Sequence, residues 1–478
     1  MSSGRRDDDV SRRTVVAAAA GLASTPVWAA AAPPALEPYL SLRAVARRIA
    51  ARELSPVHLT QRMLVRISKV DPVLKSYATV MADQAIADAK KAASEIAAGR
   101  YRGPLHGVPI GIKDLCYTKG VRTMGGLAVR RDFVPSEDAT VVTRLRAAGA
   151  VVLGKTNLSE GAAAGYNPAM DVPLNPWNHD RWPGMSSSGS GVAVAAGLCF
   201  GAVGTDTGGS IRMPSSANGV VGLKPTYGRV SRFGVMPMAP SLDHVGPMAR
   251  EVADVAIMFD AMAGRDPADP TSSDAPPAEA VKALGGGVRG LRIGVDHAYA
   301  SVNIDPGQAR AIEAALKELE RQGAVITPVR MPDLTDVTPV WMAICAAEMV
   351  AAHAETYPSR AAGYGPYLRE FLATGASLTP QELTKARRRR AELTAQMDAL
   401  LVRWMRWPGP RAATRPGRSP TRCRPARCRP TTRPGARLSR AAPSSPCRWT
   451  LPACPPSACR AGSLRTVFPT ASSSRPPA

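Results

Sequence analysis

The chain has 478 residues, of which 61 are Lys or Arg and 38 are Asp or Glu, so its formal net charge is +23. Hydrophobic residues make up 45% of it, which excludes a chain that is disordered throughout. So high a charge ordinarily indicates a nucleic-acid or membrane partner. However, residues 403–478 contain sixteen Arg and no acidic residue, and subtracting them leaves +7 for the first 402 residues. We therefore expect no nucleic-acid partner.

The N-terminus has the features of an export signal. Arg12 and Arg13 precede a short apolar run from Val15 to Ala23, and an Ala-rich stretch follows up to Ala32. Paired arginines before a modestly apolar run are typical of a twin-arginine signal, which predicts a signal peptide over residues 1–31 and a periplasmic or secreted protein. The alternative is a chance arginine pair in a cytoplasmic protein. The run is shorter than the roughly 20 residues that span a bilayer, so no membrane anchor is expected.

Three helices are predicted at the start of the mature chain. Apolar residues recur at helical spacing over 40–52, and Gln84 to Ala98 is rich in Ala and Lys. Between them, Ser55 and Pro56 read as an N-cap and a first helical residue, which opens a helix over 57–70.

Residues 103–250 alternate short apolar runs with Gly, Ser and Pro clusters, which predicts buried strands with tightly packed helices between them. The runs at 108–112, 150–153 and 202–204 are examples. Further on, a strand over 291–295, a helix over 308–322 and a strand over 324–329 form an α/β unit, and a long helix covers 381–401. The predicted fold class is therefore α/β. Cys116, Cys199 and Cys345 lack metal-ligand spacing and read as core thiols.

Two serine-containing segments carry the strongest chemical signal. Ser186, Ser187 and Ser188 lie in a Gly/Ser run over 183–191, and Ser210 follows 24 positions after Ser186 in a Gly-Gly-Ser segment. Asp206 and Arg212 bracket Ser210. None of the six His shows metal-ligand spacing or lies in a GxSxG motif, so neither a zinc site nor a histidine-activated serine is supported.

These segments resemble the signature of the amidase signature family of serine hydrolases. The resemblance extends over about 40–403 and is strongest over 105–250. It rests on the blocks 107–114 and 222–231 and on matching signature positions, which are Gly184, Ser186, Gly189, Gly204, Asp206, Gly208, Ser210, Arg212 and Pro214. It implies a mixed, twisted β-sheet covered by helices on both faces, within an amidase domain over 38–402.

The resemblance also implies a role for each residue of the site. Ser210 would be the nucleophile, Ser186 a bridging serine that follows a cis peptide bond, and Lys113 the base. Backbone N–H groups of Thr207, Gly208, Gly209 and Ser210 would form the oxyanion hole. Ser187, Asp206 and Arg212 would support the site, and no cofactor or metal would be needed.

A lysine can act as a base only in its neutral form. The unperturbed pKa of a lysine is about 10.4, and lowering it to about 7 costs roughly 4–5 kcal/mol, which burial can impose. Ile110 and Ile112 give Lys113 an apolar setting of the kind required. The alternative for an isolated lysine is a surface charge on an edge strand.

Two features depart from the family pattern. Met185 stands where the family usually has Gly, and its side chain is expected either to narrow the acyl pocket or to perturb the proton relay. Residues 403–478 form an Arg/Pro-rich tail, which we expect to be disordered. Codons for 451–464 read in a shifted frame can encode the family's usual ending, Thr-Gly-Leu-Pro-Ala-Val-Ser-Val-Pro-Cys-Gly-Phe-Thr. This suggests a frameshift near residues 402–407; a basic nucleic-acid-binding arm is the alternative.

The leading functional prediction is an exported amidase that hydrolyses a small or peptide-like carboxamide and that could form a homodimer. Two alternatives stay open. One is the glutaminase component of the tRNA-dependent amidotransferase, which the sequence resembles over 224–232. The other is an inactive or truncated family member, as Met185 and the tail would suggest. The identity of the amide is not readable from the sequence.

Overall fold

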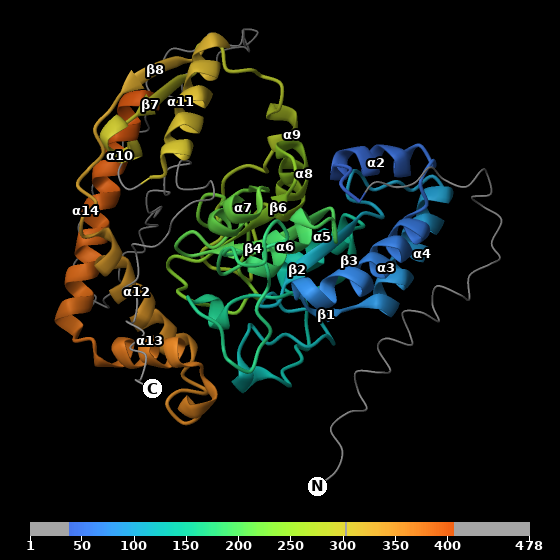
Figure 1. Cartoon of the computed structure of the whole chain (residues 1–478), viewed down its shortest axis with the longest axis horizontal. Coiled ribbons are helices and arrows are strands. Elements are labelled where there is room, and N and C mark those ends of the chain that lie inside the picture. Colours follow the sequence, from blue (N-terminus) through green and yellow to red (C-terminus); the bar gives the residue numbers. More distant parts are fainter. Residues whose placement is uncertain (1–37, 302–303, 406–478) are drawn as a thin grey trace, which may run out of the picture.

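The computed structural model describes residues 38–301 and 304–405, with the side chains of 402–405 left aside (Figure 1). The predicted signal over 1–31 and residues 406–478 of the tail lie outside these residues. Within the described part of the chain, a central six-stranded sheet has the order β1-β3-β2-β4-β6-β5, and α-helices surround it (Figure 1). The predicted α/β fold with a mixed sheet is confirmed.

The strands of this sheet run both parallel and antiparallel. Strand β2 lies between β3 and β4 and is parallel to both, whereas the β1–β3, β4–β6 and β5–β6 pairs are antiparallel. Because β2 is central and both its neighbours are present, its side chains are fully enclosed. The strands are β1 Tyr77–Val80, β2 Pro109–Lys113, β3 Val151–Thr156, β4 Gly201–Asp206, β5 Val221–Gly222 and β6 His244–Ala249.

The helices around the sheet begin close to the predicted positions. Ser41 caps the first of them by accepting a hydrogen bond from the Ala44 backbone N–H at 3.2 Å. Ser55 and Pro56 occupy the N-cap and the first helical position of the second as expected, although the Ser55 side chain makes no capping hydrogen bond. The helices are α2 Leu42–Ala50, α3 Pro56–Leu74, α4 Ala82–Ala97, α5 Thr140–Ala147, α6 Ser188–Ala195, α7 Arg212–Asn218 and α8 Val252–Met262.

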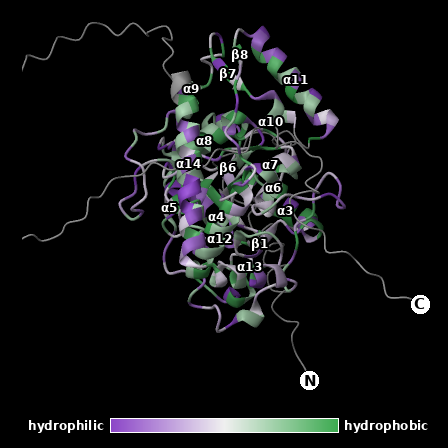
Figure 2. Ribbon diagram, turned by 90° about the vertical axis from the view of Figure 1, so that its left-hand side faces the viewer, coloured by the Kyte–Doolittle hydropathy of each residue, from purple (hydrophilic) through white to green (hydrophobic). Residues whose placement is uncertain are grey.

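The second half of the described chain adds a small α/β unit and a group of helices. Strands β7 Arg292–Val295 and β8 Val325–Pro328 pair in parallel, and α11 Pro306–Arg321 connects them. In Figure 2, α11 alternates hydrophilic and hydrophobic patches, as an amphipathic helix should. Helix α12 packs against α13 and α14 (Figure 1). The remaining bounds are α9 Ala280–Ala283, α10 His297–Ser301, α12 Val337–Ala352, α13 Pro366–Ser377 and α14 Pro380–Met405.

The core lies between the sheet and its helices, where Ile110, Ile112 and Val203 are fully buried. Cys116, Cys199 and Cys345 are buried free thiols, as predicted. No helix within residues 38–301 and 304–405 is long and apolar enough to cross a membrane.

Candidate functional site

Lys113 is the last residue of β2, and its ammonium or amine group lies inside the protein. The residue is 0% exposed, between the fully buried strands β3 and β4. Its Nζ lies 2.8 Å from each of three hydroxyl oxygens, those of Ser186, Ser187 and Thr205. In the described part of the chain no carboxylate oxygen lies within 4.0 Å of this nitrogen, which therefore has hydroxyl partners but no ion pair.

This setting changes the protonation of Lys113. Burial lowers the pKa of Lys113 from 10.5 to about 7, although charge interactions with Cys116, Asp206 and Asp243 partly oppose the effect. Burial disfavours the charged form of a lysine, and hydroxyl dipoles replace only part of the lost hydration. At neutral pH a large fraction of Lys113 is therefore the neutral amine that a base must be.

Ser186 and Ser187 reach Lys113 from the segment just before α6. The Met185–Ser186 peptide bond is cis, as the family resemblance implies. The Ser187 hydroxyl also lies 3.2 Å from the Thr205 backbone N and O, which ties this segment to β4. The Met185 sulfur accepts a hydrogen bond from the Gly165 N–H at 3.4 Å, and the Lys113–Ser186 hydrogen bond forms with Met185 in place.

Ser210 lies between β4 and α7 and is 8% exposed. Its backbone carbonyl accepts a hydrogen bond from the Ser187 N–H at 3.2 Å, which holds the two serine segments together. The Ser210 hydroxyl makes no hydrogen bond within residues 38–301 and 304–401, and none joins it to the Ser186 hydroxyl. The structure thus brings Lys113 and Ser186 into direct contact and places Ser210 beside them.

Asp206 holds the loop that carries Ser210. Its carboxylate accepts hydrogen bonds from the Gly209 N–H at 2.8 Å, from the Ile211 N–H at 3.1 Å and from the Arg212 guanidinium at 2.9 and 3.0 Å. Burial by itself raises the pKa of Asp206, but the Arg212 charge and these donors outweigh it and lower the pKa. Asp206 and Arg212 are therefore an ion pair that shapes the loop.

The same contacts revise the predicted set of oxyanion donors. The Gly209 N–H already donates to Asp206, so it is not available to a substrate. The N–H groups of Thr207, Gly208 and Ser210 have no such partner among the residues described, and Gly208 is exposed. Three of the four predicted donors therefore remain.

Removing the Asp206 carboxylate is expected to destabilise the protein. Asp206→Ala would leave the Arg212 guanidinium and two backbone N–H groups without their acceptor, and breaking a buried ion pair costs about 3–5 kcal/mol. The measurement is the free energy of unfolding in urea. Asp274→Ala is the matched control, because it breaks an ion pair with Arg265 in which both side chains are mostly exposed, and it should change nothing. Equal effects in the two variants would contradict the role given to Asp206.

Asp243 and Trp341 are two further residues at this loop, and the sequence did not single them out. The Thr207 hydroxyl donates to the Asp243 carboxylate at 2.6 Å, and Asp243 also accepts from the Met238 and Ala239 N–H groups. Trp341 of α12 donates its Nε1–H to the Thr207 carbonyl at 3.1 Å. These contacts span 36 and 134 positions, so no local motif signals them.

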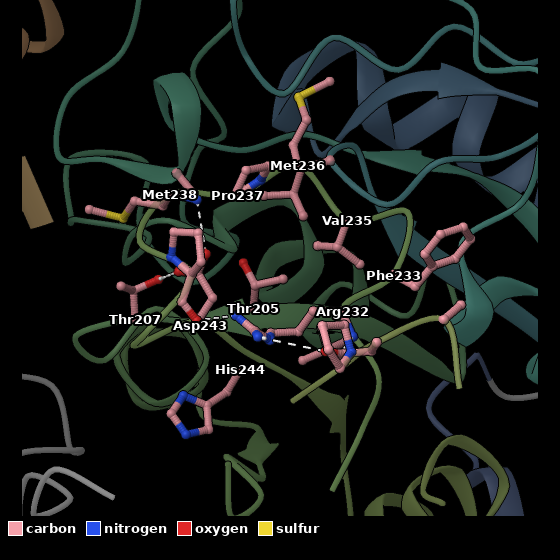
Figure 3. Close-up of a pocket in the computed structure, with 17 residues that line it drawn as sticks. Thr205, Thr207, Arg232, Phe233, Val235, Met236, Pro237, Met238, Asp243 and His244 are labelled. Carbon is pink, nitrogen blue, oxygen red and sulfur yellow. Dashed lines mark hydrogen bonds and ion pairs between the residues drawn. The ribbon is translucent and has the colours of Figure 1, made fainter. Parts of the chain in front are cut away.

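A cavity of about 220 Å³ lies next to the loop. Thr205 and Thr207 line it, together with apolar residues such as Met236 and Val245 (Figure 3). Lys113, Ser186 and Ser210 do not line it, so the cavity adjoins the reactive groups without enclosing them. Residues 38–301 and 304–401 contain no cluster of His, Cys, Asp and Glu with the makeup of a metal site.

Known proteins agree with this geometry. The amidase family model matches residues 58–404. A Mycobacterium tuberculosis protein named as an amidase, AmiD, is 45% identical over 358 residues, which is 75% of each chain. The amidase-type component of the glutamyl-tRNA(Gln) amidotransferase of Roseiflexus castenholzii is 43% identical over 353 residues, 70% of this chain and 72% of that one.

Solved structures point the same way. The peptide amidase from Stenotrophomonas maltophilia superposes with a TM-score of 0.69 at 34% identity and covers 78% of this chain and 83% of its own. A bacterial aryl acylamidase of the amidase signature family reaches a TM-score of 0.70 at 25% identity, over 76% and 78%. Sequence and fold together show that the chain belongs to the amidase signature family of amide-hydrolysing enzymes.

Proposed function

We propose that this amidase cleaves a carboxamide through a covalent intermediate on Ser210, with Lys113 as the base and Ser186 as the proton relay. The observation that carries the proposal is the hydrogen bond between the fully buried Lys113 Nζ and the Ser186 hydroxyl beside Ser210. A serine hydroxyl becomes an effective nucleophile when a neighbouring base accepts its proton. A lysine whose pKa is about 7 can do so at neutral pH.

The reaction follows from these positions in two halves. Ser186 passes its proton to neutral Lys113 and takes the proton of Ser210, whose Oγ bonds to the amide carbonyl carbon. The N–H groups of Thr207, Gly208 and Ser210 stabilise the negative oxygen. The proton then returns through Ser186 to the leaving nitrogen, and the C–N bond breaks to release ammonia or an amine. Water attacks the resulting ester by the same relay, which frees the carboxylate and restores Ser210.

The activity should depend on pH through Lys113. Because the base must be neutral, and burial lowers its pKa to about 7, kcat/KM should rise with pH and level off above a midpoint near 7. Two pH units below that midpoint, the rate constant should be roughly 100-fold lower. The measurement is kcat/KM from pH 5 to 9. A profile that is flat over this range, or a midpoint near 10, would contradict the assignment.

The substrate class is tested by a panel of amides. The relatives include a peptide amidase, an aryl acylamidase and a component of an amidotransferase, so the panel needs peptide amides, anilides and glutamine. The proposal expects turnover of at least one amide by the protein alone. Ammonia release from glutamine that requires the other amidotransferase chains would instead support the amidotransferase alternative. No turnover of any amide would support an inactive family member.

We also propose that residues 1–31 direct export and that residues 403–478 are read out of frame. The Arg12-Arg13 pair and the absence of any acidic residue in the tail support these two proposals. Fusing residues 1–31 to a reporter should give export that depends on the twin-arginine pathway and is lost when both arginines become Lys. Resequencing codons 402–407 should reveal a one-base change; an unaltered frame would refute the second proposal.

A further inference from the structure

Trp341 contacts the loop that carries Ser210 in two ways. Its Nε1–H donates to the Thr207 carbonyl at 3.1 Å. Its ring lies over the next residue, because a Cβ added to Gly208 would come within 2.6 Å of the Trp341 Cζ2 atom. The indole therefore covers one side of the peptide group that joins Thr207 to Gly208, and it belongs to α12, far from β4 in sequence.

This peptide group contains both the accepting carbonyl and a candidate oxyanion donor. The Thr207 C=O and the Gly208 N–H belong to one planar trans unit, so they point in opposite directions. A hydrogen bond that fixes the carbonyl toward Trp341 therefore fixes the Gly208 N–H on the side away from the indole. Donating to a carbonyl also polarises the amide and strengthens its N–H as a donor.

A second anchor keeps the unit from rotating. The Thr207 hydroxyl donates to the buried Asp243 carboxylate at 2.6 Å, and this carboxylate is itself held by backbone N–H groups of Met238 and Ala239. Thr207 is thus tied through its side chain to the segment before β6 and through its carbonyl to α12. The Gly209 N–H, bound to Asp206, cannot substitute for the Gly208 N–H.

We propose that Trp341 is a positioning residue, which orients and polarises the Gly208 N–H toward the oxyanion of the reaction. The proposal rests on the proposed function, since it assumes that Ser210 attacks a carbonyl. Charge on the carbonyl oxygen develops in the transition state, so the contribution of Trp341 should appear in kcat and not in substrate binding.

The test is Trp341→Phe, which keeps an aromatic ring but removes the Nε1–H. We expect kcat to fall about 10-fold, because one oxyanion donor is misdirected but not deleted, while KM changes less than twofold. Labelling of Ser210 by a fluorophosphonate should slow by a similar factor, since the phosphoryl oxygen uses the same donors. This second measurement does not depend on knowing the natural amide.

Trp177→Phe is the matched control. The Trp177 Nε1–H donates to the Asn218 carbonyl at 2.8 Å, at the far end of α7, and the side chain is largely exposed. The control removes the same kind of hydrogen bond and should leave kcat, KM and the labelling rate unchanged. Both variants should unfold at the same temperature as the wild type to within about 3 °C.

Three outcomes would overturn the inference. In the first, Trp341→Phe behaves like Trp177→Phe. In the second, KM rises with kcat unchanged, which would make Trp341 a substrate-binding residue. In the third, kcat falls only in proportion to lost folded protein. Failure of the proposed function looks different: turnover would then persist in Ser210→Ala, whatever Trp341→Phe does.

Discussion

Replacing Ser210 with alanine should lower kcat/KM for any amide that the protein hydrolyses by roughly 10⁴-fold or more, because no acyl-enzyme can form. The fold should survive, since the Ser210 hydroxyl makes no hydrogen bond in the described part of the chain and only its backbone carbonyl holds Ser187. The measurement is steady-state hydrolysis together with the midpoint of thermal unfolding.

Ser216→Ala is the control for this variant. Ser216 lies on α7, close to Ser210 in sequence and half-buried, but outside the Lys113 network. It should retain the wild-type rate. If Ser210→Ala kept more than about a hundredth of the wild-type activity, another group would have to be the nucleophile.

Lys113→Met should separate activity from stability. Without the base, kcat/KM should fall by roughly 10³-fold, within the range that general-base catalysis supplies. Methionine is close to lysine in size and carries no charge to bury, and the partners of Lys113 in the described structure are hydroxyl groups and not carboxylates. We therefore expect the unfolding midpoint to stay the same or rise.

Lys155 provides a matched comparison for that experiment. It is also fully buried, but its Nζ lies 3.4 Å from the buried Asp114 carboxylate and 2.8 Å from the Cys116 carbonyl. Lys155→Met would leave Asp114 without its cation, so it should destabilise the protein by about 3–5 kcal/mol and leave the activity of the folded fraction intact. Equal losses of activity in the two variants would contradict the role of Lys113 as base.

The sequence predicted the reactive residues more completely than the residues that hold them. The blocks around Lys113, Ser186 and Ser210 are local patterns, and the structure places all three side by side. Thr205 was not singled out, although its hydroxyl contacts Lys113 as closely as the two serines do. Its place at the end of β4 follows from strand pairing, which motifs do not encode.

The limits of sequence reasoning are clearest at the oxyanion loop. Glycines indicated that the backbone is accessible, but not which N–H groups are free. The Asp206 carboxylate folds back onto Gly209, and Trp341 reaches the loop from α12. Both contacts depend on side-chain packing, one of them between residues 134 positions apart. A similar limit applies at Ser55, whose N-cap position was predictable but whose missing side-chain hydrogen bond was not.

The most direct test of the account is to locate the fluorophosphonate adduct by tandem mass spectrometry. Trypsin should release a peptide over 182–212 that contains Ser186, Ser187, Ser188, Ser190 and Ser210. The account predicts a single adduct on Ser210, absent from Ser210→Ala and formed far more slowly in Lys113→Met. An adduct on Ser186 or on another serine, or labelling that is as fast without Lys113, would contradict it.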